Sequence, residues 1–499
     1  MAEEVELKLA LAERHQSRFL SHPLLKQAVL RHVETLGNIY YDTADLSLRR
    51  HGIALRLRRK GREWLQTVKL AGSSAAGLSS RPEWETPYSG QFDFSVVDVP
   101  AVRERLQQPK LLARIIPICE TRFRRITWRF AAGPGAILLT LDRGWVIAGG
   151  RREAISEVEL ELAGAPLQDM FGLAMQLARR VTLTPSVWSK AERGYRLHSG
   201  VLPLPFKPEA PALSAAMPAF EAFRHIALSC LERLQQNHRG AVAGDDPEYM
   251  HQMLIATHRL RAALRLFAPL LPEHLAESLP APLLTLMKSL ERARDLDLLL
   301  SETAAPVLSA LPDEPRLPAL AGDITHRRNA AREQAIALLE APDYGLGLLT
   351  MLESLHATPV PDPAPVALCS FAAERLRRLR KKLRRLALAA NTDDPASLHT
   401  LRIGVKRLRH ALGFFSSLAS PRSLRRVMRQ LAAAQAALRQ VDNLAHAGAT
   451  LMDCAGDDPR LREAVTLIGG WHGARYASLL ARISRDLERL AGLRLPRLG

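Results

Sequence analysis

Charged and apolar side chains alternate in five short stretches of the first 200 residues. The clearest are Glu4-Val5-Glu6-Leu7-Lys8 and Glu157-Val158-Glu159-Leu160-Glu161, and the same alternation occurs at 56–58, 83–85 and 125–129. Residues two apart on a β-strand share a face, so each stretch predicts a strand with one charged and one apolar face. A barrel would turn the apolar faces outward beneath covering elements and the charged faces inward.

Acidic and basic residues both occur on these strands, and this mixture limits the kinds of ligand that such an interior could bind. Buried charges of mixed sign are costly unless ions or a ligand accompany them. Carboxylates suit a divalent metal, and Arg and Lys suit phosphate groups. We therefore predict a tunnel for a polyanion and a metal. The alternative is an antiparallel sheet whose charged face is solvated.

The pattern changes near residue 200. A Pro-rich linker is predicted at 201–212, and long Ala, Leu and Arg stretches with helical spacing follow it. Residues 1–200 and 213–499 are therefore predicted to be separate domains, and the second is predicted to be all-helical.

Further breaks and helices are predicted inside the two domains. Pro-rich pieces at 311–318 and 359–365 are expected to divide the helical domain into groups. In the first domain, the spacing of apolar residues predicts helices at 167–180 and 24–36.

The helical part contains an internal repeat. An Asp-Pro pair precedes His251 in one copy and His399 in the other, and the apolar positions that follow recur with a constant offset of 148 residues. The Asp and the Pro are expected to be an N-cap and a first helical residue. In each copy the apolar residues form one stripe with His, Arg and Lys opposite it. The repeat therefore predicts two equivalent helices with basic faces.

The composition is strongly basic, with 69 Lys and Arg against 51 Asp and Glu, a net charge of +18 and a pI near 10.3. This balance favours polyanionic partners, whereas an aromatic content of 5% disfavours nucleic acid because few side chains can stack on bases. The four cysteines are too scattered to predict a zinc site or a disulfide framework. With neither a signal peptide nor a bilayer-spanning apolar run evident, we expect a cytoplasmic protein that does not enter a membrane.

The first domain resembles the CYTH domains, or triphosphate tunnel metalloenzymes. The resemblance begins at Glu4-x-Glu6-x-Lys8 and continues in order through Gln66-Thr67-Val68-Lys69, Arg81-Pro82-Glu83-Trp84-Glu85 and Ser156-Glu157-Val158-Glu159-Leu160-Glu161 to Lys190-x-x-Arg193-Gly194-Tyr195. It implies an eight-stranded antiparallel tunnel. The family includes inorganic triphosphatases, thiamine triphosphatases and class IV adenylyl cyclases.

These residue types suit phosphoryl transfer, which needs positioning and charge neutralisation more than covalent help. The predicted phosphate-binding residues are Lys8, Arg56, Arg58, Lys69, Arg125 and Lys190. The predicted ligands of Mg²⁺ or Mn²⁺ are Glu4, Glu6, Asp142, Glu157, Glu159 and Glu161, and the alternation leaves open which two of the last three bind the metal. The predicted catalytic residues are Glu4, Glu6 and Lys8. Lys8 is either a phosphate ligand or a proton acceptor with a depressed pKa.

The second domain resembles the CHAD domain, a conserved-histidine α-helical domain, through the two His-containing helices and Arg294-Asp295-Leu296-Asp297. The resemblance implies two four-helix halves around a basic groove that binds inorganic polyphosphate. The chain departs from the family at Leu254, where Arg is usual, and at Val441-Asp442-Asn443. A solvated basic face on a helical bundle is the alternative. The residues expected to bind polyphosphate are His251, Arg259, Arg261, Arg265, His399, Arg402, Lys406, Arg407 and Arg409.

The predicted fold is therefore α+β with two domains, an antiparallel β-barrel tunnel followed by an all-α helical bundle with two pseudo-repeats. The expected function is metal-dependent hydrolysis of inorganic triphosphate to pyrophosphate and phosphate. The second domain would bind polyphosphate, with polyphosphate granules as a further partner.

Three alternatives remain open. One is a protein that binds polyphosphate without catalysis. Another is a thiamine triphosphatase or class IV adenylyl cyclase, for which Trp64 and Trp84 could supply an aromatic pocket. The third is nucleic-acid binding through the Arg-rich stretch at 375–385.

Overall fold

The computed structural model describes residues 3–200, 204–276, 279–358 and 366–498. They form two compact units, Met1–Phe206 with Glu340–Ala357, and Lys207–Leu339 with Thr358–Gly499. The Pro-rich piece predicted at 359–365 lies outside the described residues, as do the first three residues of the predicted linker. The predicted domain boundaries follow chain order, whereas packing assigns residues 340–357 to the first unit.

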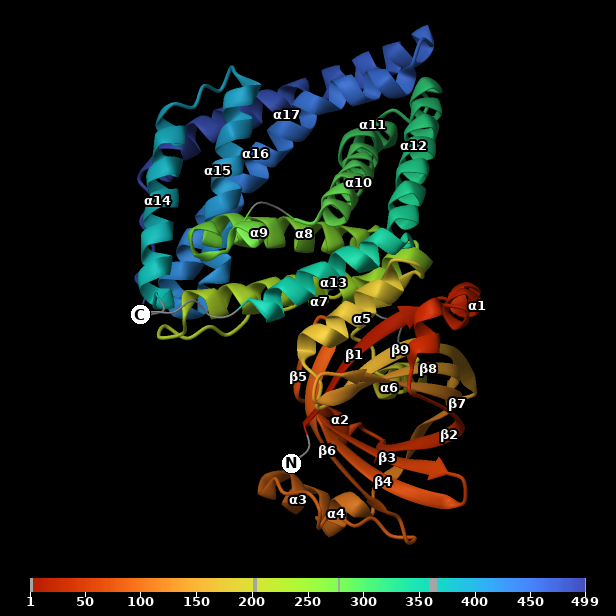
Figure 1. Ribbon diagram of the computed structural model, residues 1–499. Coiled ribbons are helices and arrows are strands. Elements are labelled where there is room, and N and C mark those ends of the chain that lie inside the picture. The colour runs from red at the N-terminus through yellow and green to blue at the C-terminus, as the bar shows by residue number, and fades with distance from the viewer. Residues whose placement is uncertain (1–2, 201–203, 277–278, 359–365, 499) are drawn as a thin grey trace. The chain divides into compact units, whose positions relative to one another are not determined.

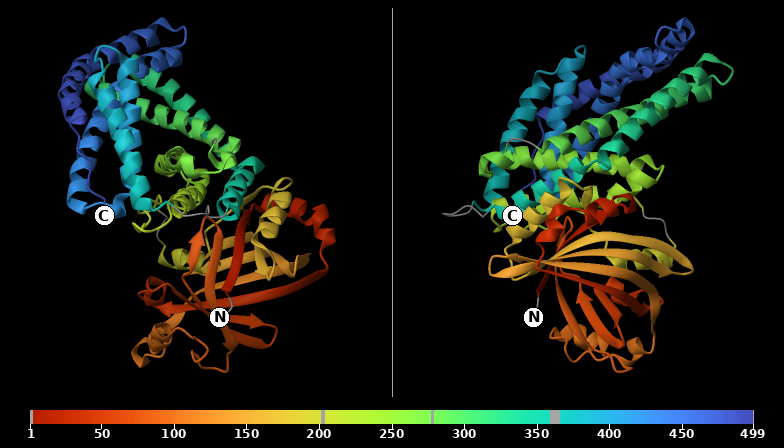
Figure 2. Two further views of the ribbon diagram at one scale, coloured as in Figure 1. Left: turned by 60° about the vertical axis from the view of Figure 1, so that its left-hand side comes forward. Right: turned by 45° about the vertical axis from the view of Figure 1, so that its right-hand side comes forward.

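Within the described residues, eight antiparallel strands close a barrel in the first unit (Figures 1 and 2). A pairing between β6 and β1 closes the ring, as the predicted tunnel requires. The short strands β5 (Ser73–Ala75) and β10 (Leu183–Pro185) extend it by pairing with β6 and β1. In order around the barrel, the strands are β1 (Glu3–Leu11), β9 (Arg151–Ala163), β8 (Gly135–Ala148), β7 (Ile115–Ala132), β2 (Leu30–Thr43), β3 (Ile53–Lys60), β4 (Glu63–Leu70) and β6 (Leu78–Pro87).

The ring closes and its inward charged side chains are buried, with Glu6, Lys8 and Arg56 only 6–7% exposed, which excludes the solvated-sheet alternative. The apolar faces of the strands are covered as well. Leu7 and Leu9 alternate with the charged residues of β1 and are 0% exposed. Helix α5 (Leu167–Ala178) packs on β9, in agreement with the helix predicted there. Helix α3 (Pro100–Leu106) contributes Leu106 to an apolar cluster with Leu55 of β3. The remaining short helices of this unit are η1 (Glu13–His15), α1 (Gln16–Leu20), η2 (Pro23–Gln27), α2 (Ser47–Arg50) and α4 (Pro109–Leu112).

The helix predicted at 24–36 is wrong over most of its length. Only the 3-10 helix η2 occurs in it, and β2 begins at Leu30. The spacing of Val33 and Leu36 is compatible with a helix, but β2 pairs with β7 from Leu30 opposite Arg129 to Thr43 opposite Ile115. This long ladder decides the local structure, because strand formation depends on cross-strand partners more than on intrinsic preference.

Helix α6 (Lys190–Ser199) fills one end of the barrel interior. Its Leu197 packs with Phe123 and Val146, and Phe123 lies on the same face of β7 as the inward residue Arg125. Gly194 allows this close approach, because a Cβ there would lie 2.1 Å from Cys119 Sγ. The helix thereby closes part of the tunnel and brings its first residue, Lys190, into it.

The second unit repeats a group of four helices. The offset of 148 residues relates the starts of α8 and α15, at Pro247 and Pro395. The predicted N-caps are confirmed, since Asp246 accepts a hydrogen bond from the Glu248 N–H and Asp394 accepts one from the Ala396 N–H. The first group is α7 (Ala219–Ala243), α8 (Pro247–Phe267), α10 (Ala281–Leu298) and α12 (Arg316–Leu339), and the second is α14 (Leu368–Leu388), α15 (Pro395–Phe414), α16 (Pro421–Ala455) and α17 (Pro459–Ala491).

Short elements connect these helices. A break at 311–315 separates α11 from α12, close to the predicted Pro-rich break. None of the described helices could cross a bilayer alone, although α12 and α13 (Pro342–Ala357), which are separated by a sharp bend in the chain, together meet the length and composition that a span requires. The connecting elements are η3 (Ala268–Leu270), α9 (Glu273–Ala276), the π-helix η4 (Leu299–Ala304), α11 (Ala305–Ala310) and η5 (Ser416–Leu418).

Helix α13 (Pro342–Ala357) lies between α12 and α14 in the chain but packs on α5 and β10 in the first unit (Figure 1). Its apolar residues are buried, including Leu348 and Leu352 at 0% exposure. The unit that contains the barrel is therefore completed by a helix from the second half of the chain.

Candidate active site and basic groove

Strand register assembles the charged residues of the tunnel. Opposite Glu6 of β1 stands Glu161 of β9, and opposite Lys8 stands Glu159. Residues directly opposite on neighbouring strands have Cβ atoms about 4.5–5.5 Å apart. Charges more than 150 positions apart in the sequence therefore become neighbours.

Strand register also brings charged residues together on the other strands of the barrel. Asp142 of β8 stands between Arg125 of β7 and Glu157 of β9. On the other side, Glu4 of β1 stands opposite Arg81 of β6. Each of these carboxylates thus has a basic side chain on an adjacent strand or within reach of it.

A cavity with an empty volume of about 820 Å³ lies inside the barrel. All six predicted phosphate-binding residues line it: Lys8, Arg56, Arg58, Lys69, Arg125 and Lys190. Of the predicted metal ligands, Glu4, Glu6, Glu159 and Glu161 also line it, whereas Asp142 and Glu157 do not. The structure therefore brings the predicted site residues together around one space, with two carboxylates behind the lining.

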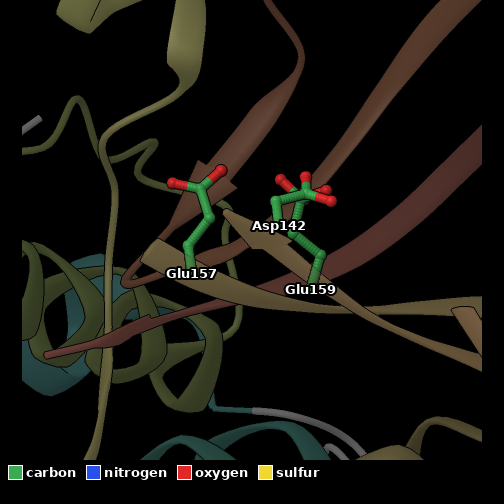
Figure 3. Close-up of side chains that lie close together, drawn as sticks. All are labelled: Asp142, Glu157 and Glu159. Atoms are coloured by element: carbon green, nitrogen blue, oxygen red, sulfur yellow. The ribbon is translucent and has the colours of Figure 1, made fainter. Parts of the chain in front are cut away.

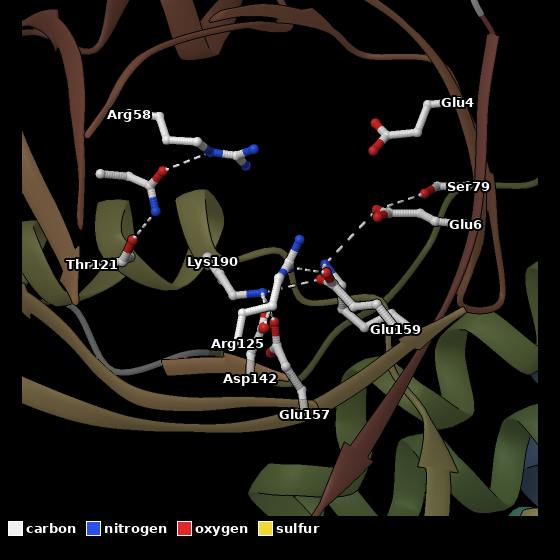
Figure 4. Close-up of polar contacts among 12 residues, drawn as sticks. Glu4, Glu6, Arg58, Ser79, Thr121, Arg125, Asp142, Glu157, Glu159 and Lys190 are labelled. Atoms are coloured by element: carbon white, nitrogen blue, oxygen red, sulfur yellow. Dashed lines mark hydrogen bonds and ion pairs between the residues drawn. The ribbon is translucent and has the colours of Figure 1, made fainter. Parts of the chain in front are cut away.

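Asp142, Glu157 and Glu159 form an acidic cluster whose nearest oxygens lie within 4.8 Å of one another (Figure 3). Lys190 Nζ lies 2.7 Å from Asp142 Oδ2 and 3.1 Å from Glu159 Oε1, and it also pairs with Glu157. Arg125 Nη2 donates to Asp142 Oδ2 at 2.6 Å and to Glu159 Oε2 at 2.8 Å (Figure 4). Two basic side chains therefore already neutralise this cluster.

Burial alone would lower the pKa of Lys190, but the surrounding Asp142, Glu157 and Glu159 outweigh burial and raise it. Burial likewise opposes ionisation of Glu159, yet Lys190, Lys8 and Arg125 hold its pKa well below the usual range. Lys190 and Glu159 are therefore held in their charged forms, and the contacts of Lys190 and Arg125 make the cluster a salt-bridge network.

A second group of carboxylates, Glu4, Glu6 and Glu161, is neutralised less completely. Glu4 accepts a hydrogen bond from Lys69 Nζ at 2.9 Å, and Glu6 pairs with Arg81. Glu161 makes neither an ion pair nor a hydrogen bond within the described part of the chain. Burial first, and then Glu4 and Glu6, raise the pKa of Glu161 to about 7. A cation between these three carboxylates would relieve that repulsion.

Lys8 lies between the two carboxylate groups, with its Nζ 3.1 Å from Glu159 Oε1 and 3.9 Å from Glu6 Oε1. Burial would lower its pKa, but Glu159, Glu6 and Glu157 together raise it. A raised pKa keeps the ammonium protonated. Of the two roles predicted for Lys8, this geometry favours the phosphate ligand over the proton acceptor.

Further basic side chains lie on β3 and β4. Arg56 Nη2 lies 3.3 Å from Glu83 Oε1, and Lys69 Nζ lies 2.6 Å from Glu83 Oε2. Arg58 forms no ion pair with the described residues, and its Nε donates to Asn38 Oδ1 at 3.1 Å. Burial, then Arg56 and Arg125, lower its pKa. Figure 4 shows Arg58 and Glu4 pointing into the opening from opposite walls.

Sequence reasoning missed some residues of the site. Arg81 lines the cavity and pairs with Glu6, although the alternation that singled out Glu83 already placed it on the inward face. Asn38 lines the cavity and holds Arg58, and its amide also donates to Thr121 Oγ1 at 2.8 Å. Nothing near Asn38 in the sequence indicated this role, because it depends on the register of β2 against β3 and β7.

A basic groove lies in the second unit between α8, α14 and α15, with an empty volume of about 1320 Å³. Four of the predicted polyphosphate-binding residues line it: Arg261, Arg265, Lys406 and Arg407. Sequence reasoning did not assign the other basic residues of its lining, which are His258, Arg375, Lys382 and His410.

The other five predicted residues lie outside this lining. His399 and Arg402 both contact Asp442, at 2.7 Å from Nδ1 to Oδ1 and 3.2 Å from Nε to Oδ2. Arg259 lies over the ring of Phe414, and Arg409 donates to Gln435. His251 Nδ1 has no hydrogen-bond partner among the described residues. Through Asp442, His399 and Arg402 connect α15 to α16.

Nearby carboxylates neutralise only part of the positive charge on the residues that line the groove. Burial, followed by the neighbouring Lys406, lowers the pKa of both His258 and His410 to about 3. Burial and Arg402 lower the pKa of Lys406 to about 8. His258 Nε2 lies 3.3 Å from Glu291 Oε1, and with this pKa the imidazole is neutral, so the contact is not an ion pair between two charges. Such depression of basic groups is the electrostatic signature of a site that an anion would stabilise.

The chain is similar to two known domain families. It matches the CYTH domain over residues 2–195 and the CHAD domain over residues 225–452. The first match covers the barrel. The second covers most of the helical region and includes α13.

Individual relatives agree with these matches. An inorganic triphosphatase of Haemophilus influenzae is 34% identical over 200 residues, which are 40% of this chain and 56% of that protein, so only a little over half of the relative is matched. The crystal structure of the CHAD domain from the plant Ricinus communis is 34% identical, covers 59% of this chain and 99% of that domain, and has a TM-score of 0.52. A putative adenylyl cyclase from Hippeastrum, described as having a dominant triphosphatase activity, is 21% identical, covers 40% and 97% of the two chains, and has a TM-score of 0.31, too low to support an argument.

Proposed function

The chain joins a CYTH domain to a CHAD domain, and on this premise we propose that its barrel hydrolyses inorganic triphosphate to pyrophosphate and phosphate with Mg²⁺ or Mn²⁺. One cavity supports this function best, because its lining includes Arg58 and Glu161, neither of which forms an ion pair with the described residues. Arg58 points into the opening from the wall opposite Glu4 (Figure 4). A linear polyanion with a divalent cation would satisfy both walls. The similarity to an inorganic triphosphatase supports the same substrate.

The metal is proposed to bind Glu4, Glu6 and Glu161, with Glu159 beside them. Hard divalent cations prefer carboxylate oxygens, and Glu161 forms no ion pair with the described residues, although Lys69 and Arg125 lower its pKa from a greater distance. Asp142 and Glu157 are less suitable because Lys190 bridges them, and Arg193 also donates to Glu157. When bound, the metal would polarise phosphate oxygens as a Lewis acid.

The basic residues are proposed to bind and orient the triphosphate. Arg58 is available at once, whereas Arg56 and Lys69 would exchange part of their contact with Glu83 for phosphate oxygens. Lys8 would neutralise charge on the phosphate that reacts, because its raised pKa keeps it protonated. Fixed donors in a partly buried site cost little reorganisation, which is how such groups accelerate phosphoryl transfer.

Phosphate release from tripolyphosphate, compared with ATP and thiamine triphosphate and measured with Mg²⁺, Mn²⁺ or EDTA, tests the activity. We expect Glu161→Gln to require about tenfold more metal for half-maximal rate, the scale of one lost charged contact. Glu63→Gln is the matched control, because Glu63 is exposed on the same barrel. Equal metal requirements for the two variants would contradict the metal site.

The same assay separates the alternatives. Release from none of the three substrates would favour a protein that binds polyphosphate without catalysis. A preference for thiamine triphosphate or ATP would favour the other CYTH activities. The structure supports those activities less, because neither Trp64 nor Trp84 lines the described cavity, and Trp84 packs with Phe94 in the outer apolar cluster.

The groove of the second unit is proposed to bind inorganic polyphosphate. The depressed pKa of Lys406 and of its two histidine neighbours supports this, since a bound polyanion would restore their protonation. Such binding could deliver chain ends to the barrel or hold the protein on polyphosphate granules. We place the protein in the cytoplasm, where its four free thiols would remain reduced.

Titration of the protein with a long polyphosphate tests the groove. We expect Arg261→Ala to weaken binding about tenfold, the scale of one charge-assisted contact, and to make the salt dependence shallower. Arg384→Ala is the control, because Arg384 is exposed on α14 and is not in the groove lining. Equal effects of the two variants would indicate a solvated basic face, and preferential competition by DNA would indicate a nucleic-acid site.

A further inference from the structure

Helix α13 belongs to the CHAD match by sequence and to the barrel unit by packing. Six of its side chains are at most 2% exposed: Tyr344, Leu348, Leu349, Met351, Leu352 and Leu355. At one end the ring of His356 stacks on Phe171 of α5, with 6.0 Å between ring centroids. Just before the helix, Glu340 pairs with Arg14 at 3.0 Å. Contacts along its whole length thus attach α13 to the first unit.

A glycine marks where α13 meets β10. A Cβ on Gly345 would lie 1.9 Å from the carbonyl oxygen of Leu183, so only glycine lets the helix backbone approach the strand this closely. Glycine in a helix costs about 1 kcal/mol relative to alanine. The close packing of α13 on β10 therefore explains why a glycine stands in the first turn of this helix.

Strand β10 is short and holds two tunnel residues in place. It pairs with β1 from Leu9 to Leu11, and the next amide, Ser186 N–H, donates to the Lys8 carbonyl at 2.8 Å. Four residues further along the chain, Lys190 begins α6 and points into the cavity. A displacement of β10 would therefore move the backbone at Lys8 and the start of α6 together.

We propose that α13 is a positioning element of the tunnel, which holds β10 against β1 and so fixes Lys8 and Lys190. A three-residue strand has few hydrogen bonds of its own, and the apolar face of α13 supplies the packing that keeps it in register. The effect on turnover rests on the proposed function, whereas the effect on backbone order does not. Part of the region matched by the CHAD domain thereby belongs to the working barrel.

Hydrogen exchange of the full-length wild-type protein is the first test. We expect amides of α13 to open together with those of β10 and α5, as one cooperative unit. If the amides of α13 instead exchange together with those of α12 and α14, the proposal is overturned. This comparison needs no substitution and no catalytic activity.

The second test compares two Gly→Ala changes in helices. In Gly345→Ala the new methyl group meets the Leu183 carbonyl, whereas in Gly322→Ala of α12 no atom lies within 4 Å of it. We expect faster exchange at 183–190 and a KM for tripolyphosphate raised about tenfold in Gly345→Ala alone. A loss of folded protein would lower kcat with KM unchanged, so the KM increase separates misplacement from simple destabilisation.

If Gly345→Ala does not fold, His356→Ala loosens the other end of α13 without a backbone clash and takes its place. Unchanged exchange at 183–190 and unchanged KM in the folded variant would overturn the proposal. If the wild type hydrolyses no tripolyphosphate, the proposed function fails, but the exchange measurements still decide the role of α13.

Discussion

At the scale of single residues, the pKa of a carboxylate or an ammonium group in this protein depends on the charges that surround it. Glu159 and Glu161 are two positions apart on one strand, yet the pKa of Glu159 lies well below its usual range and that of Glu161 is raised to about 7. Burial raises the pKa of both groups, but at Glu159 the contacts with Lys190, Lys8 and Arg125 outweigh burial, whereas at Glu161 the charges of Glu4 and Glu6 add to it. Residue type alone does not distinguish them.

Lys406 provides a prediction at this scale. Its depressed pKa of about 8 means that the free groove loses a proton as the pH rises, whereas a bound polyanion would keep the ammonium charged. Polyphosphate affinity should therefore fall between about pH 7 and about pH 9, by at most about tenfold per pH unit for one proton. Titrations in this window test it. Lys406→Arg, which stays charged, should flatten the profile, and an unchanged slope in that variant would contradict the assignment.

The same shift has a consequence for stability. Because the pKa of Lys406 is lower in the folded protein than in the unfolded chain, the unfolded chain binds more protons between about pH 8 and about pH 10.5. Below about pH 8 this group therefore lowers the free energy of unfolding, and that loss of stability is recovered as the pH rises from about 8 to about 10.5.

At the scale of elements, helix termini and strand partners place the reactive side chains. Helix α6 begins at Lys190 because Ser189 caps it, with Ser189 Oγ accepting from the Glu192 N–H at 3.1 Å. Arg49 adds a bidentate ion pair to Glu192 in the same turn. The start of this helix is thus held at two points next to the cavity.

Removing the cap should loosen Lys190. We expect Ser189→Ala to lower the free energy of unfolding by about 1 kcal/mol, as loss of an N-cap does, and to raise the KM for tripolyphosphate. Ser189→Thr keeps a capping hydroxyl and should remain close to wild type. Chemical denaturation and steady-state kinetics check both variants. A Thr variant as impaired as the Ala variant would argue against capping as the cause.

At the scale of the whole molecule, compact units and chain order do not coincide. A fragment that ends near residue 206 lacks α13 and would expose the face of α5 and β10 that this helix covers. Deletion of the helical half is therefore an ambiguous test of whether that half delivers polyphosphate, since slower turnover would also follow from an incomplete barrel.

A pair of fragments resolves this ambiguity. We expect residues 1–206 alone to melt at a lower temperature than the same fragment with residues 340–357 fused through a flexible linker. Each fully buried apolar side chain contributes about 1.5–3 kcal/mol, as an upper bound, so the difference should be readily measured. Thermal unfolding followed by circular dichroism gives both values. Identical melting temperatures would show that the barrel does not need α13.

The sequence by itself determined the barrel class, the inward charged faces, the repeat of 148 residues and ten of the residues that line the cavity, because alternation, helical spacing and internal repeats are properties of the chain itself. Only the tertiary structure decided that Lys190 bridges Asp142 and Glu157, that Asn38 holds Arg58, that 30–36 is a strand, and that α13 packs in the unit that contains the barrel. Each of these depends on strand register or on packing between distant segments. Contacts of this kind leave no periodic pattern in the amino-acid sequence.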